Sequence, residues 1–185
     1  MKIFRYTIFS LFSILLIMSC SGDSDEEQNQ VPEFDRSTIL KNYAENIIIP
    51  RYDDFQSALA NLKSSVDAYV SSPLVSTFDK MHDDWFTAYK KWQHIEMFNI
   101  GKAEEIMFFN TVNTYPIDEL RIVENITSKK YDLSSSNDWS SQGLSGVDYM
   151  IHGVDDSKEK VIQKYIDDSK YGDYLINLLT IMSSN

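Results

Sequence analysis

The chain has little of what several common kinds of site require. Its 185 residues include a single cysteine, which excludes a disulfide framework and a cysteine-rich zinc site. Six glycines and four prolines are too few for a collagen-like or low-complexity chain, and they argue against an all-β fold with many tight turns. Only 17 basic residues stand against 28 acidic ones, so nucleic acid is not expected as a partner. The length and composition are those of one globular domain.

The first 19 residues are typical of a secretory signal peptide. Lys2 and Arg5 precede an apolar run over residues 6–18, which is too short to span a bilayer because a spanning helix needs about 20 apolar residues. The run ends in Ile17-Met18-Ser19-Cys20, which resembles the lipobox of bacterial lipoproteins. We therefore expect cleavage after residue 19 and a lipid on Cys20 that anchors the protein to a membrane. The alternative is a plain signal peptide with an incidental cysteine.

Residues 20–35 are acidic and contain no basic residue. This composition predicts a solvated tether that holds the folded part away from the membrane. The segment resembles the acidic stretch that follows the lipid-bearing cysteine in surface-exposed lipoproteins of the Bacteroidetes. We therefore expect an outer-membrane lipoprotein of the cell envelope, on its periplasmic or its external face.

Residues 36–185 show helical rather than strand periodicity, which predicts an all-α helical bundle. Proline removes a backbone donor, so we expect a kink or break at Pro50 in the first helix, and we expect Gly101 to end the second. The polar, serine-rich stretch over 128–142 predicts a mobile surface loop. The expected helices are 39–69, 77–100, 117–126, 143–151 (closed by Gly153) and 157–182, with 106–112 either a short helix or extended.

Four motifs in order resemble the imelysin-like family of bacterial lipoproteins, also called insulin-cleaving membrane proteases. The similarity covers roughly residues 36–182 and corresponds to the N-terminal half of the family pattern. The fourth motif is similar to the family's Gly-x-His-x-x-Glu helix. The motifs are Asn46-Ile-Ile-Ile-Pro-Arg-Tyr-Asp-Asp-Phe55, Trp85-Phe-Thr-Ala-Tyr-Lys-Lys-Trp-Gln-His-Ile-Glu-Met-Phe98, Tyr115-Pro-Ile-Asp118 and Gly143-Leu-Ser-Gly-Val-Asp-Tyr-Met-Ile-His-Gly153.

The resemblance implies a cell-envelope lipoprotein associated with iron or haem acquisition, and a peptidase activity has been proposed for the family. The motif's His falls on Ser145 and its Glu on Asp148, so the family's metal pair is half lost. We therefore expect a non-catalytic binding protein whose cleft is lined by Glu96, Asp118, Ser145 and Asp148, with iron, haem or zinc as the ligand. The alternatives are a metallopeptidase of the same family and a structural or partner-binding lipoprotein without a ligand.

Trp85, Tyr89, Trp92 and Glu96 step by four, three and four residues, so they share one face of the expected second helix. Such an aromatic stripe most often belongs to the core. A carboxylate on an apolar stripe destabilises the fold unless it is paired or hydrogen-bonded. Glu96 is therefore interpreted either as a ligand for a metal or small molecule or as the partner of a nearby base or tyrosine hydroxyl.

Asp148 and His152 are four residues apart on the expected short helix, so their side chains can meet. Carboxylate and imidazole are both ligands for zinc or iron, but two ligands do not make a site and spacing reveals no third. The other interpretation is a hydrogen-bonded pair at the end of the helix. His82 and His94 lie among charged residues and are expected to be solvated.

The expected last helix carries Leu175, Leu178, Leu179 and Met182 on one side. If the second half of the family pattern is missing, some of this apolar surface has no partner within the chain. An unpartnered patch would favour a homodimer or a second-half partner. The competing hypothesis is that the helices close into a complete bundle by themselves.

Overall fold

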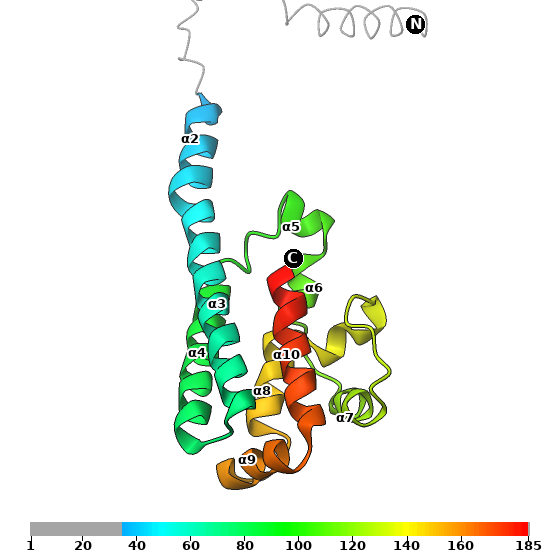
Figure 1. The fold of residues 1–185 in the computed structure, drawn as a ribbon. Coiled ribbons are helices and arrows are strands. Elements are labelled where there is room, and N and C mark those ends of the chain that lie inside the picture. Colours follow the sequence, from blue (N-terminus) through cyan, green and yellow to red (C-terminus); the bar gives the residue numbers. More distant parts are fainter. Residues whose placement is uncertain (1–34, 185) are drawn as a thin grey trace, which may run out of the picture. The chain divides into compact units, whose positions relative to one another are not determined.

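The computed structural model describes residues 35–184, so the expected signal peptide and Cys20 lie outside the described residues, with all but the end of the tether. Thr38–Asn185 form one compact unit. The described residues contain helices and no strand, which confirms the all-α fold, and none of these helices is long and apolar enough to cross a membrane (Figure 1). The elements are α2 (Arg36–Tyr43), the π-helix η1 (Ala44–Ile48), α3 (Ile49–Ser71), α4 (Val75–Gln93), α5 (Lys102–Glu105), α6 (Phe108–Val112), α7 (Glu119–Ser128), the 3-10 helix η2 (Ser136–Ser141), α8 (Gly143–His152), α9 (Lys158–Asp167) and α10 (Ser169–Ser184).

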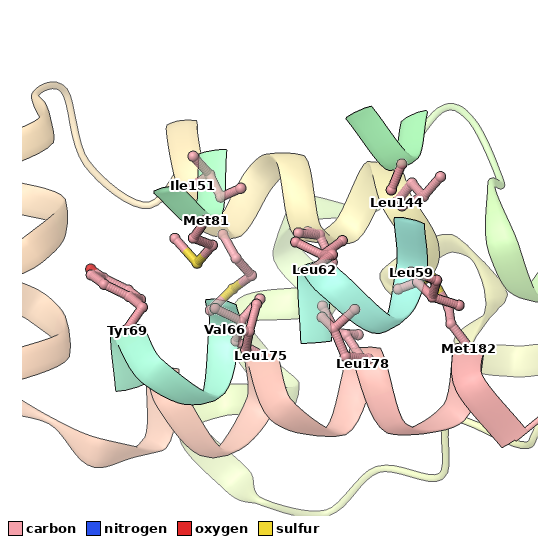
Figure 2. Packing of buried hydrophobic residues seen from close by; sticks show 14 of the residues in the cluster. Leu59, Leu62, Val66, Tyr69, Met81, Leu144, Ile151, Leu175, Leu178 and Met182 are labelled. Carbon is pink, nitrogen blue, oxygen red and sulfur yellow. The ribbon is translucent and has the colours of Figure 1, made fainter. Parts of the chain in front are cut away.

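The core lies where α3 packs against α4 and α10, and where α8 covers α4 and α10. Figure 2 shows leucines of α3 and α10 meeting in the middle of this core, with Met81 from α4 and Leu144 from α8 beside them. The expectation of unpartnered apolar residues on the last helix is wrong. Helix α10 packs between α3, α7, α8 and α9, so Leu175, Leu178 and Leu179 are fully buried and Met182 is 1% exposed.

The first helix is interrupted where Pro50 predicted an interruption. Proline cannot donate a backbone hydrogen bond, and the turn before it widens into η1. The backbone N–H of Ile49 bonds to the carbonyl of Ala44, five residues back, which is the π-helical pattern. Pro50 then occupies the first turn of α3, where its missing donor is tolerated.

The second helix ends eight residues before the predicted stop signal. Helix α4 stops at Gln93, and the chain turns so that Ile95 is 1% exposed. The hydroxyl of Tyr52 donates to the carbonyl of Phe98 at 3.0 Å and fixes this turn against α3. Gly101, predicted to end the helix, adopts φ +59° and precedes α5 instead. Tertiary contacts therefore override the helical periodicity of residues 94–100.

The stretch over 128–142 lies partly on the surface, as its polar composition predicted, but several of its residues are buried. It contains the 3-10 helix η2, and Leu133, Asp138, Ser141 and Gln142 are buried. The carboxylate of Asp138 accepts hydrogen bonds from Asn125 at 3.2 Å and from the backbone of Asp132 at 3.2 Å. Asp138 and Ser141 can be buried here because they share hydrogen bonds with Asn125 and with each other, whereas the side chain of Gln142 is buried without a hydrogen-bond partner among the described residues.

The expected last helix is two helices. Ser157 caps α9 by accepting the N–H of Lys160, and Asp168, with extended dihedral angles, separates α9 from α10. The break lets α10 turn back along α3. Gly172 makes the close approach possible, because a Cβ there would lie 2.6 Å from a methyl carbon of Val70.

Candidate functional site

Helices α4 and α8 form a surface that carries several of the residues singled out by the sequence. We call it the α4–α8 surface and define it by His82, Trp85 and Tyr89 of α4 with Asp148 and His152 of α8. The indole N–H of Trp85 donates to the carbonyl of Leu144 at 3.0 Å, which joins the two helices. Trp85 also stacks on Tyr89, with ring centroids 5.8 Å apart.

The aromatic stripe divides into a buried part and a half-buried part. Trp92 is 1% exposed and packs against Phe55 of α3, so it belongs to the core as the stripe predicted. Trp85 and Tyr89 are half-buried and remain accessible beside α8. Because they stack on each other, their exposed parts, and not both faces of each ring, remain accessible.

Asp148 and His152 form the predicted pair one turn apart on α8. The Nδ1 atom of His152 lies 2.8 Å from Oδ1 of Asp148, and both side chains are about half exposed. A carboxylate can only accept a hydrogen bond, so Nδ1 carries the proton. In the neutral imidazole the other nitrogen, Nε2, is then free to bind a metal, which is how a carboxylate orients a histidine ligand in many metal sites.

His82 lies next to His152 and Trp85, although its position in the sequence did not predict this contact. Its ring lies edge-on to that of His152, with centroids 5.2 Å apart, and 6.1 Å from that of Trp85. The side chain of His82 is 40% exposed and its Nδ1 lies 3.3 Å from Oδ1 of Asp83, so it is partly solvated among charges as expected, but one side of its ring also contacts His152. His94 is exposed as expected. Only the packing of α4 against α8 brings the two imidazoles together.

A hollow of about 310 Å³ adjoins the two histidines and reaches the start of α9. Asp155 and Lys158 line it with His82 and His152. The backbone N–H of Asp156, followed by the ammonium of Lys164, holds the pKa of the Asp155 carboxyl below its usual value. The Asp155 carboxyl therefore stays ionised in mildly acidic solution, where it pairs with Lys164 at 3.3 Å.

Ser145, which the resemblance matched to the family's histidine, has a hydrogen-bond partner 32 residues away in the sequence. Its hydroxyl donates to the side-chain oxygen of Asn113 at 2.7 Å, which ties α8 to the segment after α6. The start of α8 also touches α6 directly. Gly143 adopts φ +76°, and a Cβ there would lie 2.4 Å from the carbonyl oxygen of Val112. These contacts hold the start of α8 against α6, while α4 and α10 pack along the rest of the helix.

Glu96 and Asp118 lie outside the α4–α8 surface. Because α4 ends early, Glu96 is an exposed residue of a turn, and Ile95 takes the buried position instead. Asp118 caps α7, and its carboxylate accepts the backbone N–H of Arg121 at 3.0 Å. The structure therefore gives Asp118 a local structural role and removes Glu96 from the aromatic stripe.

The α4–α8 surface does not supply the ligand set of a bare metal ion. Within residues 35–184, no group of three or more His, Cys, Asp or Glu side chains is arranged to hold one. Zinc and non-haem iron are usually held by at least three protein ligands. In this arrangement Asp148 orients His152 by a hydrogen bond and does not itself bind a metal. A metal at this surface would therefore be bound by imidazole and would need its other ligands from a source outside this group of residues.

A second hollow, of about 670 Å³, lies between α3, α5 and the end of α10. Its wall is largely apolar, with Phe55, Phe108 and Met182 among the lining residues. Two lysines also line it, and each pairs with a nearby carboxylate: Lys63 with Asp67 at 3.1 Å and Lys102 with Glu105 at 2.6 Å. None of the residues that the sequence predicted for a site lines this hollow.

Comparison with known proteins shows the family of the chain. The iron-regulated protein A of Synechococcus elongatus is 22% identical over 79 residues, which cover 43% of this chain and 22% of that protein's own length. No solved structure matches the chain. The sequence model of the Imelysin family matches residues 48–184, from η1 to the end of α10. The chain therefore belongs to the imelysin family.

Proposed function

We propose that this chain is a haem-binding lipoprotein of the cell envelope that serves in iron or haem acquisition and is not a peptidase. The observation that carries the proposal is the hydrogen-bonded pair of Asp148 and His152, with His82 and Trp85 packed against the imidazole. The printed name of the cyanobacterial relative, iron-regulated protein A, supports a link to iron.

The number of available ligands favours haem over a bare ion. In haem the porphyrin supplies four ligands, so one or two imidazoles from the protein complete the coordination of the iron. Neutral His152 can present Nε2 because Asp148 occupies Nδ1. A bare zinc or iron ion would need a third protein ligand, and the described residues provide no such group.

The surroundings of His152 also suit a flat, largely apolar ligand. Trp85 and Tyr89 offer stacked rings, and Phe86 is 48% exposed on the same helix. Aromatic rings recognise flat conjugated ligands by stacking and by burial of apolar area. In this proposal His152 would hold the iron, Asp148 would orient His152, and the aromatic residues of α4 would supply apolar area to the ligand.

The position of Ser145 argues against a peptidase. A metallopeptidase needs a metal-bound water, and the family's motif would supply its histidine at this position. Here the hydroxyl of Ser145 donates to Asn113 at 2.7 Å. Serine in place of the motif's histidine removes one metal ligand. A binding role therefore fits the residues better than hydrolysis.

Calorimetric titration tests which ligand class the protein takes. Residues 21–185, which contain the whole compact unit, would be titrated separately with ferric haem, Fe²⁺ and Zn²⁺. We expect one haem per chain and binding of the bare ions weaker by about tenfold or more. Tighter binding of a bare ion would support the metallopeptidase alternative. No heat with any of the three would support a structural lipoprotein without a ligand.

The lipid anchor leads to a separate prediction. When cells are grown with labelled fatty acid, the wild-type protein should carry the label and remain with the membranes. The Cys20→Ala variant should carry no label, because Cys20 is the only cysteine in the chain. A wild-type protein that never takes up label would contradict the anchor and leave the plain signal peptide.

A further inference from the structure

The hollow between α3, α5 and the end of α10 has the size of a small-molecule site. Its volume of about 670 Å³ lies within the usual range of ligand pockets, about 300–1,000 Å³. In Figure 1, α5 and the end of α10 lie on the same side of α3. We call this feature the α3–α5 hollow. It extends along α3 from Tyr52 to Asp67 and shares no residue with the α4–α8 surface.

The part of the α3–α5 hollow between α3 and α6 is apolar. Phe55 and Leu59 of α3 and Met182 of α10 line it and are 2%, 5% and 1% exposed. Ile106 and Phe108, which are half-buried, complete the wall beside α5 and α6. Helices satisfy their own backbone groups, so this wall offers apolar area and few hydrogen bonds. An extended peptide would leave its backbone groups without partners here, whereas an acyl chain has none to satisfy.

Farther along α3 the hollow carries a pair of opposite charges. Lys63 and Asp67 lie one turn apart, and the ammonium of Lys63 is 3.1 Å from the carboxylate of Asp67. The two side chains are 37% and 49% exposed, so the pair contributes about 1 kcal/mol or less and can exchange partners. From Tyr52 to Asp67 the helix rises about 22 Å at 1.5 Å per residue, which leaves room for an acyl chain beside a charged headgroup.

The charges that line the hollow favour a zwitterionic headgroup over an anionic one. The lining includes Lys63 and Lys102 together with Asp53 and Asp67, and these charges sum to zero. A fatty-acid carboxylate would have to displace Asp67 from Lys63, in a chain whose formal net charge is −11. A headgroup with adjacent phosphate and ammonium would instead give Lys63 and Asp67 one partner each.

We propose that the α3–α5 hollow binds a zwitterionic lipid with a single acyl chain. The chain would lie against Phe55, Leu59 and Met182, the phosphate would bind Lys63, and the ammonium would bind Asp67. A lysophospholipid with an ethanolamine headgroup has this chemistry. The site is independent of haem binding, because the hollow and the α4–α8 surface have no residue in common.

Calorimetric titration of residues 21–185 with lysophosphatidylethanolamine, at concentrations below micelle formation, tests the proposal. We expect one lipid per chain and binding of palmitate weaker by about fivefold or more. Ala60→Trp places a large ring in the hollow from an exposed position on α3 and should weaken lipid binding by about tenfold or more. Ala68→Trp is the matched control, because Ala68 is also exposed on α3 and does not line the hollow. This control should leave the lipid affinity unchanged.

Two further variants test the role of the charged pair. Asp67→Asn removes the partner of the ammonium, so it should weaken binding of lysophosphatidylethanolamine by about fivefold and strengthen binding of palmitate. Lys63→Met removes the partner of the phosphate or carboxylate and should weaken both lipids. A wild-type chain that binds no lysophosphatidylethanolamine, or that prefers palmitate, would overturn the proposal. Lipid binding that Ala60→Trp leaves unchanged would overturn it as well.

Discussion

Replacing Asp138 with alanine should destabilise the domain by about 2–4 kcal/mol. Asp138 is 5% exposed, and its carboxylate accepts from Arg121 at 3.1 Å, from Asn125 and from the backbone of Asp132. Its removal leaves the buried donors short of partners, and each such group costs about 1–3 kcal/mol. Because Arg121 is partly exposed, water compensates for part of its loss. Urea unfolding followed by circular dichroism measures the change.

Asp132→Ala is the matched control for Asp138. Asp132 is exposed, and its carboxylate accepts from Ser134, its neighbour two residues on. The same substitution there should cost about 1 kcal/mol or less, because the freed groups of Ser134 can bond to water. Equal losses in the two variants would show that the buried network around η2 does not hold the 128–142 segment in place.

Gly143→Ala should destabilise the domain by about 3 kcal/mol or more. Gly143 has φ +76°, a conformation that L side chains rarely adopt. Its added Cβ would also lie 2.4 Å from the carbonyl oxygen of Val112, which belongs to the backbone and cannot rotate away. The strain should move α8 away from α6 and lower haem affinity together with stability. Urea unfolding and haem titration of the same samples measure both effects.

Gly101→Ala separates the two causes of the stability lost in Gly143→Ala, which are the backbone strain and the contact of the added Cβ with Val112. Gly101 also has a positive φ, +59°, but no atom lies within 4 Å of a Cβ built there. Because Gly101 has ψ −125° and lies outside the left-handed helical region, alanine there should cost only the backbone strain, about 1–3 kcal/mol. If the two glycines tolerate alanine equally, the contact between α8 and α6 is not a determinant of the fold.

Helices whose ends are set by local chemistry were predictable from the sequence. The start of a helix at residue 157, the stop at Gly153 and the interruption at Pro50 all depend on residues within one turn of the helix end. The end of α4 depends instead on Tyr52 and Phe98, which are 46 residues apart in sequence. No pattern within residues 77–101 could reveal that contact.

The same distinction applies to the candidate site. Asp148 and His152 were found because a four-residue step on a helix brings side chains together. His82 was missed because it meets His152 only through packing of α4 on α8. Glu96 was misplaced because the prediction assumed that the second helix continues past residue 96. Helix α4 ends at Gln93 instead. Asp138 looked like part of a polar loop because its partners lie on other elements.

The central claim is that His152 binds haem iron on the α4–α8 surface, and an absorbance titration tests it most directly. Ferric haem added to residues 21–185 should give the shifted Soret band of imidazole-bound haem, saturating at one haem per chain. His152→Ala should lose this band. His94→Ala, at an exposed histidine that lies 3.3 Å from Arg51 and outside the α4–α8 surface, should keep it. A spectrum that stays that of free haem, or a shift that His152→Ala leaves unchanged, would contradict the account.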